Sequence, residues 1–78
     1  MSESIAKIGL SGMQRSHENA AKHAKELSDS FNPANPEASK DPVEPMVGLM
    51  QDRHQAEASA KIVKVAKEMD DAVLDILA

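Results

Sequence analysis

All four prolines of this 78-residue chain lie in one segment, FNPANPEASKDPVEP, which runs from Phe31 to Pro45. A residue that precedes a proline is pushed toward extended geometry, so no helix continues through this segment. The rest of the chain contains no proline. We therefore predict one small domain, residues 1–78, in which two long helices flank a loop at about 31–42.

The part of the chain before the prolines has the residue spacing of a helix. Its apolar and small side chains recur at alternating steps of three and four, which predicts one face of a helix over about 4–30. The members of this face are Ala6, Leu10, Met13, His17, Ala20, Ala24, Leu27 and Phe31. Ser4 is expected to cap the start of the helix. Gly9 and Gly12 each cost about 1 kcal/mol relative to Ala, which predicts loose and flexible first turns.

The part after the prolines follows the same rule and predicts a second helix over about 43–77. Its face consists of Val43, Val47, Met50, His54, Ala58, Ile62, Val65, Met69, Ala72 and Ile76. Asp41 has the position of an N-cap, Pro42 that of the first helical residue, and Glu44 completes the spacing of a capping box.

Two helices with apolar stripes and a short connection predict an all-α fold, an antiparallel coiled-coil-like hairpin. The hydrophobic 41% of the chain is mostly aliphatic, with one Phe and neither Trp nor Tyr, which suits helix packing. Small residues are expected to allow a close approach of the helices, and larger ones to fill the space beyond. The small residues are Ala56, Ala58 and Ala60, and the larger ones are Ile62, Val65 and Met69.

Two helices cover each other along only one stripe, so we expect assembly into a four-helix bundle or a larger homo-oligomer. The same stripes are the expected contacts with neighbouring molecules. The predicted interface residues are Leu10, Met13, Ala24, Leu27, Met50, Ala58, Ile62, Val65, Met69 and Ile76.

The side chains offer little for catalysis or ligand binding. The chain has no cysteine, and His17, His23 and His54 show neither an HExxH pattern nor a pair at a spacing of four. We therefore expect no metal, no cofactor and no enzymatic activity. Because His17 and His54 fall on the two apolar stripes, we expect them to face each other midway along the hairpin, where they would either set its register or lie at the edge of the interface.

The charges and the hydropathy exclude two classes of partner. Thirteen acids are interspersed with nine Lys and Arg, for a net charge of −4, which argues against binding to nucleic acid. No stretch approaches the ~20 apolar residues of a membrane span, and the N-terminus lacks the features of a secretory signal. We expect a soluble protein that is made in the cytoplasm and does not insert into a membrane.

Three acids, Asp70, Asp71 and Asp75, lie at the C-terminal end of the second predicted helix, where the helix dipole disfavours negative charge. A hairpin would bring the N-terminus of the first helix and Lys7 beside them. We expect this arrangement to relieve the conflict.

Both predicted helices resemble segments of the bacterial flagellar rod and hook proteins. The matching stretches are IGLSGMQRSHENAAKHAKEL in the first helix, and DPVEPMVGLM, AEASAKIVKVAKEM and VLDIL in the second. In that family the two terminal helices pair as an antiparallel coiled coil that lines a tube, and large middle domains lie between them. The resemblance implies a miniature that keeps the terminal helices and closes them with a short loop.

The expected function is that of a non-enzymatic structural or interaction module related to flagellar rod proteins. It would bury its helix faces against copies of itself or against flagellar axial subunits. The resemblance also implies export by the flagellar secretion apparatus without a cleaved signal, and a place in the flagellar basal body. The alternative is a cytoplasmic adaptor or chaperone-like regulator that holds flagellar subunits before export.

Overall fold

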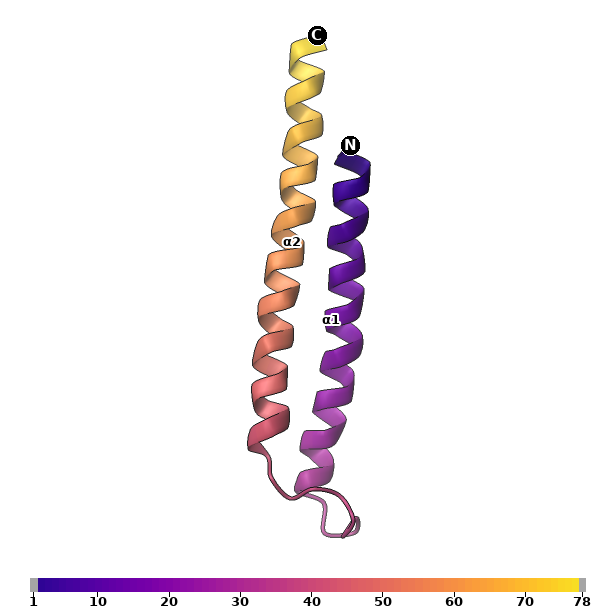
Figure 1. Cartoon of the computed structure of the whole chain (residues 1–78), viewed down its shortest axis with the longest axis vertical. Coiled ribbons are helices and arrows are strands. Elements are labelled where there is room, and N and C mark those ends of the chain that lie inside the picture. The colour runs from indigo at the N-terminus through magenta and orange to yellow at the C-terminus, as the bar shows by residue number, and fades with distance from the viewer. Residues whose placement is uncertain (1, 78) are drawn as a thin grey trace.

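The computed structural model describes residues 2–77. Helix α1 spans Ser2–Ser30 and helix α2 spans Val43–Leu77, and the two run antiparallel, side by side along most of their length (Figure 1). The helical hairpin predicted from the sequence is confirmed. Its dimensions are 64 × 15 × 12 Å, so the molecule is a rod two helices wide.

The loop between the helices is held by backbone hydrogen bonds and by one lysine. Lys40 Nζ donates to the carbonyl oxygens of Asn32 and Asn35, at 2.7 and 2.8 Å. Two further backbone bonds close turns within the loop, from the Asn35 N–H to Asn32 and from the Ala38 N–H to Asn35, both at 3.3 Å. The proline-rich segment therefore has a defined path that returns the chain antiparallel.

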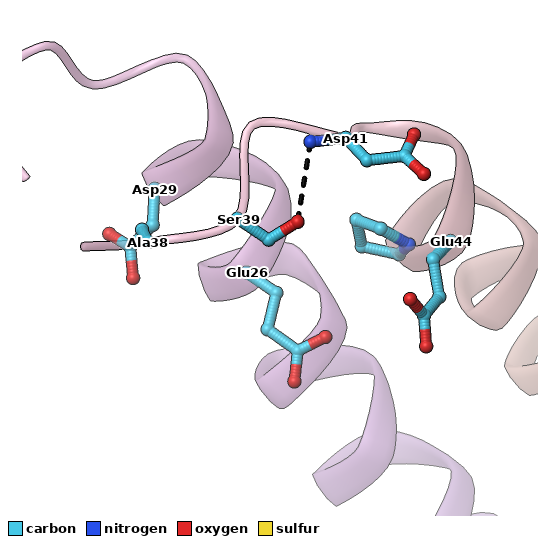
Figure 2. Close-up of a pocket in the computed structure, with 7 residues that line it drawn as sticks. Glu26, Asp29, Ala38, Ser39, Asp41 and Glu44 are labelled. Atoms are coloured by element: carbon cyan, nitrogen blue, oxygen red, sulfur yellow. Dashed lines mark hydrogen bonds between the residues drawn. The ribbon is translucent and has the colours of Figure 1, made fainter. Parts of the chain in front are cut away.

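The start of α2 is capped largely as predicted. The Val43 N–H donates to Asp41 Oδ1 at 3.0 Å, which confirms Asp41 as the N-cap. The return bond of a capping box comes from Ser39 and not from Glu44, because the Asp41 N–H donates to the Ser39 hydroxyl at 3.3 Å (Figure 2). At the other helix the prediction was wrong: α1 already begins at Ser2, so Ser4 lies inside the first turn.

The residues buried between the helices lie at multiples of seven along each helix, with Gly48 as the exception, and we call the whole set the hairpin seam. In α1 they include Gly9, Ser16 and Ser30, and in α2 they are Pro45, Gly48, Asp52, Ser59 and Ala66. Within residues 2–77, Ala66 is the only buried hydrophobic side chain. The centre of the contact is thus made of small and polar residues, and half-buried apolar side chains such as Ile62 and Val63 flank it beside Gly9.

The hairpin seam is displaced from the predicted stripe by one residue in each helix. Gly9 and Ser16 are buried where Leu10 and His17 were expected, and Ser59 is buried where Ala58 was expected. One residue corresponds to a rotation of about 100° around a helix. The physical reason is that small side chains let the helix backbones approach closely, whereas a stripe of Leu and Met would hold them apart.

The rod leaves an unusually large surface exposed. The accessible surface is 6082 Å², whereas a compact monomer of the same mass would expose about 4,600 Å². Side chains that a globular core would cover are therefore in contact with solvent, and their arrangement determines what the molecule can bind.

Candidate interaction surface

The two helices approach each other closely at the glycines of α1. A methyl group at Gly9 would lie 2.6 Å from Val63 Cγ2 and 3.0 Å from the carbonyl oxygen of Ser59, and a methyl group at Gly12 would collide with the Ser59 hydroxyl. Both glycines are helical, and Gly9 is buried. The glycines were expected to loosen the start of the helix; the structure shows a helix from Ser2 in which they make room for α2, and the flexibility of these turns stays a prediction.

A hydrogen-bonded pair of a histidine and an aspartate occupies the seam closer to the loop. His23 Nδ1 lies 2.6 Å from Asp52 Oδ2, and the Asp52 side chain is 8% exposed. Gly48 leaves space for the imidazole, since a methyl group there would lie 2.8 Å from the His23 ring. His17 and His54, which were expected to face each other in the seam, are both exposed. The histidine of the seam is the one that falls on neither predicted stripe.

Two buried serines of the seam form local hydrogen bonds. The Ser16 hydroxyl donates to the Met13 carbonyl at 2.8 Å, and the Ser30 hydroxyl donates to the Leu27 carbonyl at 2.6 Å. Among the described residues, no buried side-chain nitrogen or oxygen lacks a hydrogen-bond partner. The polar seam therefore avoids the penalty for unpaired buried groups, but it buries little apolar surface.

All ten predicted interface residues lie outside the buried seam. Eight are exposed, namely Leu10, Met13, Ala24, Met50, Ala58, Val65, Met69 and Ile76, and two are half-buried, Leu27 and Ile62. The hairpin itself does not use them as its core. They are free to contact another molecule, and the contacts predicted for them between molecules stay a prediction.

Two shallow grooves run between the helices on opposite faces of the hairpin. One is lined by Lys7, Ile8, Ser11, Gly12, Arg15, Ser59 and Ile62. The other is lined by Met13, Ser16, His17, Ala20, Leu49, Asp52, Arg53 and Ala56. The first has basic side chains at its margin, and we call it the basic groove.

The apolar stripe of α1 and that of the C-terminal half of α2 lie on different faces. Met13 and Ala20 line the groove on one face, whereas Ile62 lines the basic groove on the other. Gly12 and Met13 are consecutive residues and line different grooves, as expected for positions about 100° apart on a helix. One hairpin therefore presents two separate apolar surfaces and cannot bury either one against the other.

Helix α2 extends beyond α1 at the open end of the hairpin (Figure 1). The Ser2 hydroxyl donates to Asp70 Oδ1, so the start of α1 is level with Asp70, as expected from the position of the acids. Lys7, in contrast, pairs with Glu3 at 3.8 Å and not with an acid of α2. We call residues 71–77 the overhang, and all of them are exposed. The overhang carries Val73, Leu74, Ile76 and Leu77 together with Asp71 and Asp75.

A small pocket at the loop end is lined largely by acids. Its volume is about 250 Å³, and Glu26, Asp29, Asp41 and Glu44 are among its lining residues (Figure 2). Within residues 2–77, no three His, Cys, Asp or Glu side chains are placed so that they could hold a metal ion. The pocket therefore gives no basis for a metal site.

Comparison with protein-family models, with curated proteins and with solved structures finds no match to this chain. Neither helix, over the described residues, is long and apolar enough to cross a membrane. A proposal for the function therefore depends on the exposed surfaces of the hairpin and on the resemblance of its sequence.

Proposed function

We propose that this protein is a non-enzymatic interaction module that works as an oligomer and buries its exposed apolar faces against copies of itself. The observation that carries the proposal is that the large hydrophobic side chains of the protein lie mostly on its surface and not in a core. Fourteen large ones between Ile8 and Leu77 are exposed, against a single buried alanine, Ala66. Exposed apolar surface on this scale is typical of protein interfaces.

The exposed area supports an interface of ordinary size. The accessible surface of 6082 Å² exceeds that of a compact monomer of this mass by about 1,500 Å². A standard protein interface buries about 800 Å² on each partner. One such contact would thus cover about half of the excess, which leaves surface for a second neighbour.

The proposal extends to flagellar axial subunits as partners and to the flagellar basal body as the place of action. Its support is the resemblance of the two helices to the terminal segments of rod and hook proteins. The stretch AEASAKIVKVAKEM, residues 56–69, carries much of that resemblance and contains Val65 and Met69, which are exposed. The stretch that most resembles the axial proteins thus includes side chains that are exposed for contact with another subunit.

The decisive experiment measures mass and helicity over a dilution series, by size-exclusion chromatography with light scattering and by circular dichroism. We expect the mass to be a multiple of that of one chain, and Met69→Asp to lower the mass at a given concentration. Ala60→Asp adds the same charge at another exposed position of α2 and serves as the control. Full helicity of the unmodified protein at the mass of one chain would refute the proposal.

Incorporation into purified basal bodies distinguishes the axial role from the adaptor role. Recovery of the protein with the rod after salt and detergent washes is expected for an axial component. A stable dimer that is never recovered with basal bodies would favour the cytoplasmic adaptor.

A further inference from the structure

The longest apolar stripe on the surface runs along the C-terminal half of α2. Its members follow steps of three, four, three and four, the spacing of a coiled-coil contact. They are Ile62, Val65, Met69, Ala72 and Ile76. Ile62 is half-buried, Val65 and Met69 are 49% and 38% exposed, and Ile76 on the overhang is 83% exposed. The stripe begins beside α1 and continues onto the overhang, where α1 is absent.

No other described part of the chain can cover this stripe. Helix α2 is continuous to Leu77, so the overhang cannot fold back onto its own hairpin. The start of α1 is level with Asp70, and the loop lies at the opposite end of the rod (Figure 1). The overhang can therefore reach an apolar groove only on another molecule.

The stripe is complementary to itself when two copies run antiparallel. Ile62 and Ile76 are each seven residues from Met69. A two-fold axis at Met69 would therefore place Ile62 opposite Ile76 of the second copy, and Val65 beside Val73 of the second copy. Such an isologous contact uses the same surface on both molecules and closes after two copies.

The charges along one edge of the stripe favour the same orientation. Lys61, Glu68 and Asp75 lie seven residues apart, at the position that flanks the stripe. Antiparallel pairing brings Lys61 of each copy opposite Asp75 of the other, so this pair occurs twice in the dimer. It also brings the two Glu68 side chains near each other. A parallel pairing in register places like charges at the same level and brings neither Lys61 nor Asp75 to an opposite charge.

The groove beside the stripe fits the overhang of the second copy in shape and in charge. In the antiparallel arrangement, Ile76 of the second copy would lie near Ile62, at the basic groove. The walls of this groove include Ile8 and Ile62, and its margin carries Lys7 and Arg15. The overhang that would enter it is apolar and acidic, so apolar atoms meet the walls and carboxylates meet the basic margin.

We propose that two hairpins pair as an antiparallel dimer about a two-fold axis at Met69, each inserting its overhang along the basic groove of the other. This inference rests on the self-association in the proposed function and specifies its geometry. The dimer has four helices, with the two α2 helices in contact and the two α1 helices outside them. The groove that contains Met13 lies on the opposite face of each hairpin and takes no part in this dimer.

Disulfide cross-linking tests the position of the axis, because the chain contains no cysteine. Met69→Cys is expected to form a covalent dimer under mild oxidation, since equivalent residues on a two-fold axis lie close together. Met50→Cys places an exposed thiol on the same helix away from the axis and is the matched control. Circular dichroism checks that each variant remains helical. No cross-linking of Met69→Cys above the level of Met50→Cys would overturn the inference.

Mixed variants determine the orientation. A mixture of Ile62→Cys and Ile76→Cys chains is expected to yield the mixed disulfide, whereas cross-linking of Ile76→Cys to itself would mean parallel pairing and would overturn the inference. Lys61→Asp alone is expected to raise the dimer dissociation constant roughly tenfold. The double variant Lys61→Asp with Asp75→Lys is expected to restore it, and failure to restore it would count against the proposed register.

The mass of the unmodified protein separates this inference from the proposed function. If light scattering shows an oligomer but Met69→Cys does not cross-link, the geometry is wrong and self-association stands. If the protein is a helical monomer at all concentrations tested, both are wrong.

Discussion

Substitution of Gly9 by alanine is expected to destabilise the hairpin, although alanine is the better helix former. The added carbon would lie 2.6 Å from Val63 Cγ2 and 3.0 Å from the Ser59 carbonyl oxygen, both inside the 3.4 Å at which ordinary contact begins. The carbonyl oxygen belongs to the α2 backbone and cannot rotate away, so the helices must separate. Overpacking of this kind costs roughly 1–3 kcal/mol, and the helix propensity of alanine returns about 1 kcal/mol.

The expected net loss is therefore about 1 kcal/mol in the free energy of unfolding. Urea denaturation followed by circular dichroism, at one fixed protein concentration, measures it. Gly12→Ala is the matched variant, because its new methyl group would meet the rotatable hydroxyl of Ser59 and lie 3.2 Å from Ser59 Cβ but would meet no backbone atom of α2, and we expect a smaller loss than for Gly9→Ala. Val63→Ala in the Gly9→Ala background should recover part of the loss. If Gly9→Ala stabilises the protein by about 1 kcal/mol, as at an open helix position, the close approach of the helices is refuted.

Two further substitutions test the seam and the cap. Asp52→Ala removes the partner of His23 and is expected to lower the free energy of unfolding by about 1–3 kcal/mol. His54→Ala, at an exposed position, should change it by less than about 0.5 kcal/mol. Equal effects of the two variants in urea denaturation would contradict the assignment of His23 as the histidine of the seam. Asp41→Ala removes the cap of α2 and is expected to cost about 1 kcal/mol, measured in the same way against Asp41→Asn, which retains a capping oxygen and should cost much less.

The hairpin fold could be predicted from the sequence because its determinants are local. Pro33, Pro36 and Pro42 lie between the two helices, Pro45 falls in the first turn of α2, where a proline is tolerated, and the spacing of the apolar residues predicts helices on either side. The N-cap at Asp41 followed from its position before Pro42. None of these features depends on how one helix faces the other.

The face on which the helices meet could not be predicted from hydrophobicity. The largest apolar stripe of each helix indicated one face, but the hairpin packs on the face one residue away, through the series Gly9 and Ser16 against Ser59 and Ala66. Small residues repeated every seven positions are the signal that could have identified the seam. The pair between His23 and Asp52 depends on the register of the two helices, which no local pattern specifies.

The seam and the exposed stripes answer different physical requirements, and this difference limits how the hairpin can assemble. A seam of Gly, Ser and Ala aligns the helices closely but buries little apolar surface, so most of the hydrophobic side chains remain for contacts between molecules. Those contacts lie on two faces, one with Leu10 and Met13 and the other with Val65 and Met69. A dimer about Met69 uses only the second face.

The two faces should therefore be separable by substitution. Met69→Asp is expected to abolish the dimer and to leave any binding through the α1 face intact, whereas Leu10→Asp should leave the dimer intact and abolish binding through that face. Light scattering measures the first effect, and recovery with purified basal bodies measures the second. If axial packing instead required the face with Met69, dimer and axial packing would exclude each other, and Met69→Asp would abolish both. The dimer would then be a storage form that must dissociate before assembly.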